Sequence, residues 1–206
     1  MEYDWLAMKF IDIALGATLV VFGLGSLAGA LVTAFSSAFR EFLLLLINSR
    51  VITPVRTASS LGTVALMILI FFNNCIPVVL SFAYPLILGK VRWTPPIRKN
   101  AMFQLLVAFS LLTAGLLGFF NLGAVLTLVE ELRGPSGVNG LLATSWMHAP
   151  LEFFFVLECV SEPLRLAVRR ISGDEIVRFL RSDGNLFIVS ILGLLASAAI
   201  EAFARL

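Results

Sequence analysis

The chain is poor in charge, in cysteine and in histidine. Only 14% of its 206 residues are Asp, Glu, Lys or Arg, whereas a soluble domain typically carries about 25%. Its two cysteines, Cys75 and Cys159, form no CxxC motif, so we expect buried thiols rather than redox or metal chemistry. A net charge of +2, with no basic stripe of interleaved aromatics, argues against a nucleic-acid partner.

The sequence contains long runs without a charged residue. Hydrophobic residues make up 59% of the chain, and runs without charge extend over Ile13–Phe39, Thr57–Gly89 and Asn100–Val129. A helix needs ~20 mostly apolar residues to cross a bilayer. The sequence therefore predicts an all-α, polytopic helical membrane protein, with residues 1–206 forming one integral membrane domain.

The hydrophobic runs predict about five transmembrane helices. We place these spans at residues 11–35, 59–89, 102–129, 141–168 and 185–203. The first run is too long for a signal-peptide core, so we expect no cleavable signal peptide.

Breaker residues predict how the spans are interrupted and connected. Ala38–Ile47 is too short to span and predicts an interfacial or re-entrant helix that ends at Thr53-Pro54. We expect a kink or break near Pro77. The run Gly134–Gly140 is typical of a loop, and Pro150 or Pro163 could break the fourth span.

Basic residues predict the orientation. Five spans put the larger basic set on the side of the N-terminus: Lys9, Lys90, Arg92, Arg98, Lys99, Arg165, Arg169, Arg170, Arg178 and Arg181. The other side holds the smaller set: Arg40, Arg50, Arg56, Arg133 and Arg205. Cytoplasmic loops carry the excess of Lys and Arg, so we expect a multi-pass protein of the cell membrane with a cytoplasmic N-terminus.

The single histidine lies one helical turn from a carboxylate. His148 and Glu152 are four residues apart, which places them on one face of a helix, and Phe153–Leu157 follow without a charge. Each ionisable group costs ~2.5–3.5 kcal/mol at the centre of a membrane helix, so the pair needs partners and is a functional candidate. It could clamp helices together or handle a proton or cation, and part of a metal site in a membrane metalloenzyme is the third alternative. A zinc site needs three or four ligands, and the sequence offers no HExxH and no second histidine, so we expect no metal site, cofactor or catalytic residue.

Two adjacent amides are the second candidate. Asn73 and Asn74 lie in an apolar run and must form hydrogen bonds within the protein. We expect them near His148 and Glu152, although an ordinary amide bond between helices stays an alternative.

Two more carboxylates follow on the same predicted helix. Glu162 has Arg165 and Arg169 within reach and reads as half of an interfacial ion pair, whereas Glu158 lies deeper and joins the candidate site. Glu201 and Asp12 are near the ends of their spans, and we expect them to reach the interface.

Three short motifs in this order resemble the stage II sporulation protein M family of integral membrane proteins. They are Phe71-Phe72-Asn73-Asn74, the glycine-rich segment from Gly115 through Asn121 to Gly123, and His148-Ala149-Pro150-Leu151-Glu152. The family has an Asn pair, an Asn-Gly segment and an HGxxE helix at these places. Ala149 departs from its usual glycine, and the resemblance covers about Gly62 to Val168.

The resemblance implies a membrane scaffold rather than an enzyme. The sporulation member is similar to a scaffold that gathers cell-wall hydrolases, so the expected function is a non-enzymatic scaffold or complex subunit in envelope organisation or membrane remodelling. Protein partners in the membrane follow from this expectation, and self-association is left open. The alternative is a transporter or channel component that handles a proton or cation through Asn73, Asn74, His148, Glu152 and Glu158.

Overall fold

The computed structural model describes residues 2–90, 95–145, 148–168 and 184–204, and these residues contain helices and no strand. This confirms the all-α fold class. Within the described residues, four helical segments are long and apolar enough to cross a membrane: Ile13–Phe35, Thr63–Leu88, Asn100–Ala143 and Asn185–Ala204. The basic segment at 91–94, most of the Arg-rich segment at 169–181 and the turn at 182–183 lie outside the described residues.

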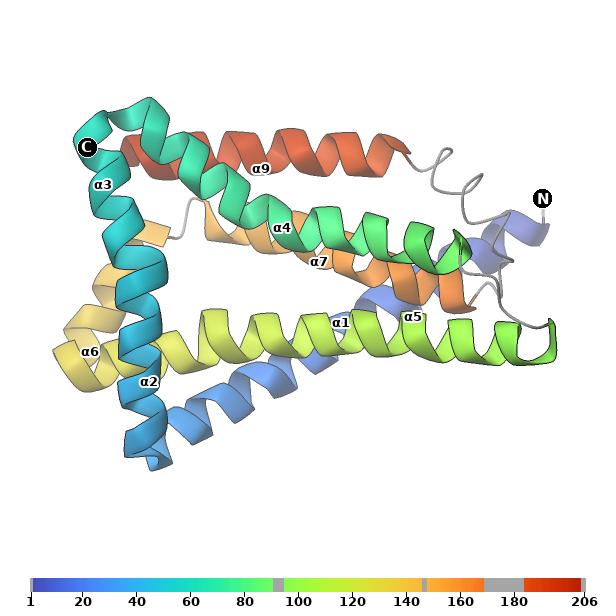
Figure 1. Ribbon diagram of the computed structural model, residues 1–206, viewed down its shortest axis with the longest axis horizontal. Coiled ribbons are helices and arrows are strands. Elements are labelled where there is room, and N and C mark those ends of the chain that lie inside the picture. Colours follow the sequence, from blue (N-terminus) through green and yellow to red (C-terminus); the bar gives the residue numbers. More distant parts are fainter. Residues whose placement is uncertain (1, 91–94, 146–147, 169–183, 205–206) are drawn as a thin grey trace.

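Four long helices surround a fifth. They are α1 (Glu2–Phe35), α4 (Thr63–Lys90), α5 (Pro95–Leu117) and α9 (Gly184–Ala204), and α7 (Ala149–Val168) contacts all four of them (Figure 1). The expected fifth span, 185–203, falls within α9. Residues Val156, Leu157 and Cys159–Ala167 of α7 are all buried, although α7 has a higher proportion of charged residues than the helices around it. The most polar of these helices is therefore the most enclosed one.

Small residues let α1 approach the end of α5 closely. The helix α5 continues into a π-helical segment, η2 (Gly118–Ala124), which packs along α1. A Cβ atom at Gly25 would overlap the backbone of Gly115, and one at Gly29 would overlap the backbone of Phe119. The Gly25–Gly29 pair is therefore used for packing within one chain, as small residues commonly are in membrane helices.

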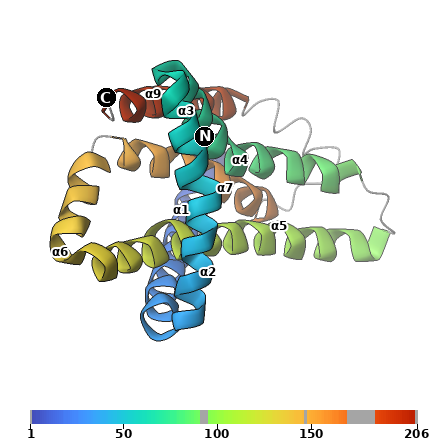
Figure 2. The same cartoon turned by 60° about the vertical axis from the view of Figure 1, so that its left-hand side comes forward.

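A crosswise arm connects α1 to α4. It consists of α2 (Ser37–Ile47), the π-helical segment η1 (Asn48–Ile52) and α3 (Thr53–Leu61), and it lies across one end of the bundle (Figures 1 and 2). The Ser36 side chain caps α2 by accepting a hydrogen bond from the Phe39 N–H at 3.2 Å. The expected end at Thr53-Pro54 is wrong, because the helical backbone continues from η1 directly into α3, with Pro54 in the first turn of α3. The arm ends at Gly62, whose φ is 109°.

The proline and glycine signals were misread at two further places. The expected loop at Gly134–Gly140 is wrong: one non-helical residue, Gly134 with φ 65°, separates two halves of α6 (Val125–Ser145), and Pro135 starts the second half. Figure 2 shows this second half turning a corner before the chain enters α7. The helix in the fourth expected span therefore begins at Ala149 rather than Leu141, and Pro163 does not break it. This helix is not one of the four described segments that are long and apolar enough to cross a membrane.

The interruption expected near Pro77 is not a break. Both Pro77 and Pro85 lie inside α4, which the structure assigns as one helix from Thr63 to Lys90. Figure 1 shows this helix changing direction near its middle. A bend is the usual effect of a proline inside a helix, since its ring displaces the preceding turn.

Exchanging Gly29 for alanine tests the contact between α1 and η2. We expect Gly29→Ala to destabilise the protein by about 1–3 kcal/mol, because the new methyl group meets the backbone of Phe119. The control Gly23→Ala has open space on the same helix and should be neutral or stabilising, since alanine favours helix. Thermal unfolding in detergent measures both variants. Equal stability of the two variants, with loss of an oligomer only for Gly29→Ala, would instead assign the glycines to a contact between chains.

Candidate functional site

The ionisable side chains of α7 fall into two clusters. The ion-pair cluster consists of Glu158, Glu162 and Arg165 in the second half of the helix. The histidine–carboxylate cluster consists of His148 and Glu152 at its start together with Glu201 of α9.

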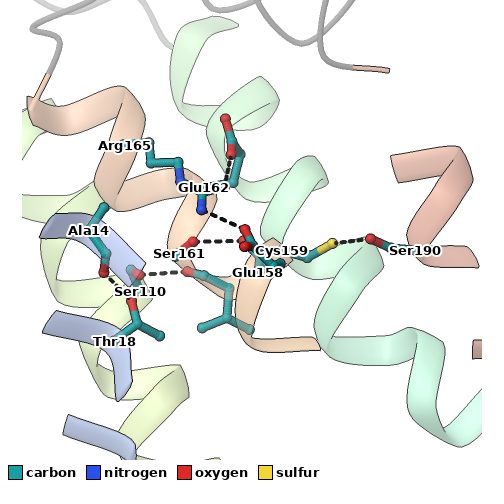
Figure 3. Close-up of polar contacts among 10 residues, drawn as sticks. Ala14, Thr18, Ser110, Glu158, Cys159, Ser161, Glu162, Arg165 and Ser190 are labelled. Atoms are coloured by element: carbon teal, nitrogen blue, oxygen red, sulfur yellow. Dashed lines mark hydrogen bonds and ion pairs between the residues drawn. The ribbon is translucent and has the colours of Figure 1, made fainter. Parts of the chain in front are cut away.

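Arg165 joins both carboxylates of the ion-pair cluster. Its guanidinium donates from Nη2 to Glu158 Oε2 at 2.5 Å and from Nη1 to Glu162 Oε2 at 3.1 Å. Figure 3 shows the three side chains converging beside α7. The expected pairing of Glu162 with Arg165 is confirmed, and the Glu162 side chain, which is only 1% exposed, is enclosed by the protein. Glu158, which was expected in the candidate site with His148 and Glu152, belongs to this ion-pair cluster instead.

Polar contacts tie α7 to its neighbours beside the ion-pair cluster. Ser110 of α5 donates to the Val160 carbonyl at 2.5 Å, and the Cys159 thiol donates to the Ser190 hydroxyl of α9 at 3.1 Å (Figure 3). Because these groups are buried, each bond satisfies an atom that has no access to water. The contacts therefore fix the position of α7 along α5 and α9.

The histidine–carboxylate cluster lies where α7 begins and α9 ends. His148 precedes α7, and its carbonyl accepts the first helical bond from the Glu152 N–H at 3.0 Å. The Ser197 hydroxyl of α9 donates to the same carbonyl at 3.2 Å. One turn further along α9, Glu201 Oε2 lies 3.6 Å from His148 Nε2. His148 and Glu201 are 7% and 9% exposed, so the pair lies inside the bundle.

A pocket of about 540 Å³ has Glu152 in its wall. It is formed by α4, the end of α5, η2, α6 and α7, and three carboxamide side chains line it together with that carboxylate: Asn73, Asn74 and Asn121. The remaining wall is largely apolar, with residues such as Pro77 and Val156. A few polar groups that converge in an apolar pocket are typical of a binding site.

The structure brings some of the expected site residues together and separates others. Asn73, Asn74 and Glu152 share the pocket, and Asn73 Nδ2 lies 3.5 Å from Asn74 Oδ1. Among the described residues, neither amide is hydrogen-bonded to His148 or Glu152, so the four do not form one hydrogen-bonded core.

Sequence reasoning did not place Glu201 beside His148. As expected, Glu201 lies near the end of its helix, in the last turn of α9, and its side chain is buried against His148. The local signal was its spacing from Ser197, four residues earlier, which puts two polar side chains on one face of an otherwise apolar helix. Nothing in that spacing identifies His148, 53 residues earlier, as the partner.

Comparisons with protein-family models, with curated proteins and with solved structures give no match to this chain. The resemblance to the sporulation protein M family therefore rests on the three short motifs alone. What the site can do has to be argued from its own geometry.

Removing the Arg165 cation should destabilise the bundle strongly. We expect Arg165→Gln to cost about 3–5 kcal/mol, because it leaves Glu158 and Glu162 without their shared cation in a dry environment. The control is Arg40→Gln, which breaks an ion pair with Glu131 that is partly exposed and should cost at most about 1 kcal/mol. Chemical denaturation in detergent compares the two. A loss at Arg165 no greater than that at Arg40 would show that the ion-pair cluster is hydrated.

Proposed function

We propose that the protein is an integral membrane protein that handles a cation or a proton, as a transporter or a channel component. The observation that supports this proposal is the pocket that Glu152 lines together with three carboxamide side chains. A carboxylate within an apolar bundle is a candidate ion site by default. Its burial is costly, so such residues are rare in membrane segments and usually serve a function. The amide oxygens of Asn73, Asn74 and Asn121 can replace part of the hydration shell of an ion.

Helix ends near the pocket add to this interpretation. Glu152 lies in the first turn of α7, where the backbone N–H groups at a helix start favour negative charge. Pro77, within α4, lines the same pocket, and its ring removes one backbone hydrogen bond nearby. Irregular helices beside polar groups are a common arrangement around ion sites in transporters.

The cell membrane, with a cytoplasmic N-terminus, is the location that we propose. The helix directions support this orientation: α1, α5 and α9 begin at the end of the bundle where α4 and α7 finish (Figure 1). The larger set of basic residues in the sequence belongs to the connections at that end, which would be cytoplasmic under the positive-inside rule.

A non-enzymatic scaffold is the second candidate function. The crosswise arm favours it, because Phe42, Leu45 and Leu61 are exposed on an element that lies across the bundle. Exposed apolar side chains on such an element suit contact with lipid or with a partner protein. The resemblance to the sporulation protein M family supports the same role in envelope organisation.

Ion flux through the purified protein tests the leading proposal. In proteoliposomes, we expect wild-type protein to conduct protons or metal cations, and Glu152→Gln to lower the flux at least tenfold because it removes the carboxylate charge from the wall of the pocket. Glu130→Gln is the matched control, since Glu130 is exposed and lies outside the pocket.

Two results would contradict the ion-handling proposal. One is wild-type flux no greater than that of empty liposomes, which would leave the scaffold as the better account. The other is equal flux through wild type and Glu152→Gln, which would separate transport from this pocket.

A further inference from the structure

We propose that His148, Glu152 and Glu201 bind a divalent transition metal ion of the zinc class. This inference deepens the proposed function, on which it rests for the route of the ion through the pocket. The three residues offer one ligand atom each, and these atoms all lie within 4.8 Å of one another. Zinc bound at 2.0–2.2 Å holds its ligand atoms about 3.3–3.5 Å apart, so small side-chain rotations would close the site.

The imidazole of His148 is an independent observation that points to a ligand. His148 is 7% exposed, and its Nδ1 has no hydrogen-bond partner within the described chain. The Nε2 atom is 3.6 Å from the nearest carboxylate oxygen of Glu201, which is longer than a hydrogen bond. A buried polar atom without a partner costs about 1–3 kcal/mol, and coordination to a metal would satisfy one ring nitrogen.

The backbone around His148 is held firmly while its ring is not. Its carbonyl accepts hydrogen bonds from the Glu152 N–H on α7 and from the Ser197 hydroxyl on α9. These two bonds hold the His148 backbone against both helices that carry the other proposed ligands. Ligands from two packed helices are therefore preorganised by backbone contacts. Because the ring itself makes no hydrogen bond within the described residues, it can rotate toward an ion without losing one.

Charge favours a divalent ion at this place. Two carboxylates carry two negative charges when they are ionised, which balances one divalent cation. Among the described residues, Glu152 has no Arg or Lys as an ion-pair partner, and Arg165 is occupied by Glu158 and Glu162. A bound cation would thus compensate the charge of Glu152, with which no basic side chain of the described residues forms an ion pair.

The donor set selects the class of metal. One imidazole with two carboxylates suits Zn²⁺, Co²⁺ or Fe²⁺, whereas Mg²⁺ and Ca²⁺ prefer oxygen ligands alone. Three protein ligands leave a fourth position open, as in sites that exchange water or substrate. Glu152 lines the pocket, so that open position lies next to the pocket through which an ion would enter or leave.

Metal binding by the full-length protein in detergent tests the inference. We expect one Zn²⁺ per chain by isothermal titration calorimetry, with Mg²⁺ binding at least 100-fold more weakly. The variants His148→Gln and Glu201→Gln should each weaken Zn²⁺ binding at least tenfold. Glu130→Gln, a carboxylate outside the cluster, should bind as wild type does.

A second measurement on wild type alone avoids dependence on variants that fold poorly. Bound Co²⁺ should give the intense visible absorption of a four- or five-coordinate ion, and Zn²⁺ should displace it. No Zn²⁺ binding, a weak spectrum of six-coordinate Co²⁺, or unchanged affinity in well-folded His148→Gln and Glu201→Gln would each overturn the inference.

The outcome is separable from that of the flux experiment. Stoichiometric Zn²⁺ binding without flux would support the metal site and contradict transport. Flux that depends on Glu152 without Zn²⁺ binding would support transport of another ion and overturn the metal site.

Discussion

The paired burial of Arg165 with Glu158 and Glu162 is the constraint on which the structure depends. In a chain with so few charges, α7 carries three carboxylates and a guanidinium inside a sheath of apolar helices. Such groups can be enclosed only if they neutralise one another, and the two short contacts to Arg165 do this. The surrounding helices pack around α7 through two kinds of contact. The small residues of α1 allow close approach to η2, and the hydroxyls of Ser110 and Ser190 form hydrogen bonds with α7.

The fixed second half of α7 positions its first turn. Glu152 lies ten residues before Glu162, about 15 Å along the helix axis at 1.5 Å per residue. At that end the carboxylate lines the pocket, while His148 contacts Glu201. One half of α7 thus has paired charges that hold the bundle together, whereas Glu152 at its start forms no ion pair with a basic side chain of the described residues. This division is why we assign the ion site to the start of α7.

Hydropathy predicted the helices well, because the length of an apolar run is a local property. The span expected at 185–203 and the helix Gly184–Ala204 agree within a residue at each end. The prediction of the connections was wrong where proline was taken as the end of a helix. Pro54 and Pro135 instead occupy first turns of helices, a position in which proline is tolerated and which composition does not distinguish from a break.

The site could be predicted only in part, because sequence spacing records local geometry and not which helices pack together. His148 and Glu152 are one turn apart, so their common face follows from sequence spacing. The partner Glu201, the pocket beside Asn121 and the burial of Glu162 depend on which helices pack together, and no local pattern records this.

The packing of α7 against α9 inside the bundle is the central claim, and one disulfide tests it directly. Cys159 Sγ lies 3.1 Å from Ser190 Oγ, so Ser190→Cys in a Cys75→Ala background should form an intrachain disulfide in native membranes under mild oxidation. Val189→Cys, on the exposed face of α9, should not. Mass spectrometry of digested protein identifies the linked peptides. Efficient linkage at 190 alone is the predicted result, and no linkage at 190, or equal linkage at both positions, would contradict the account.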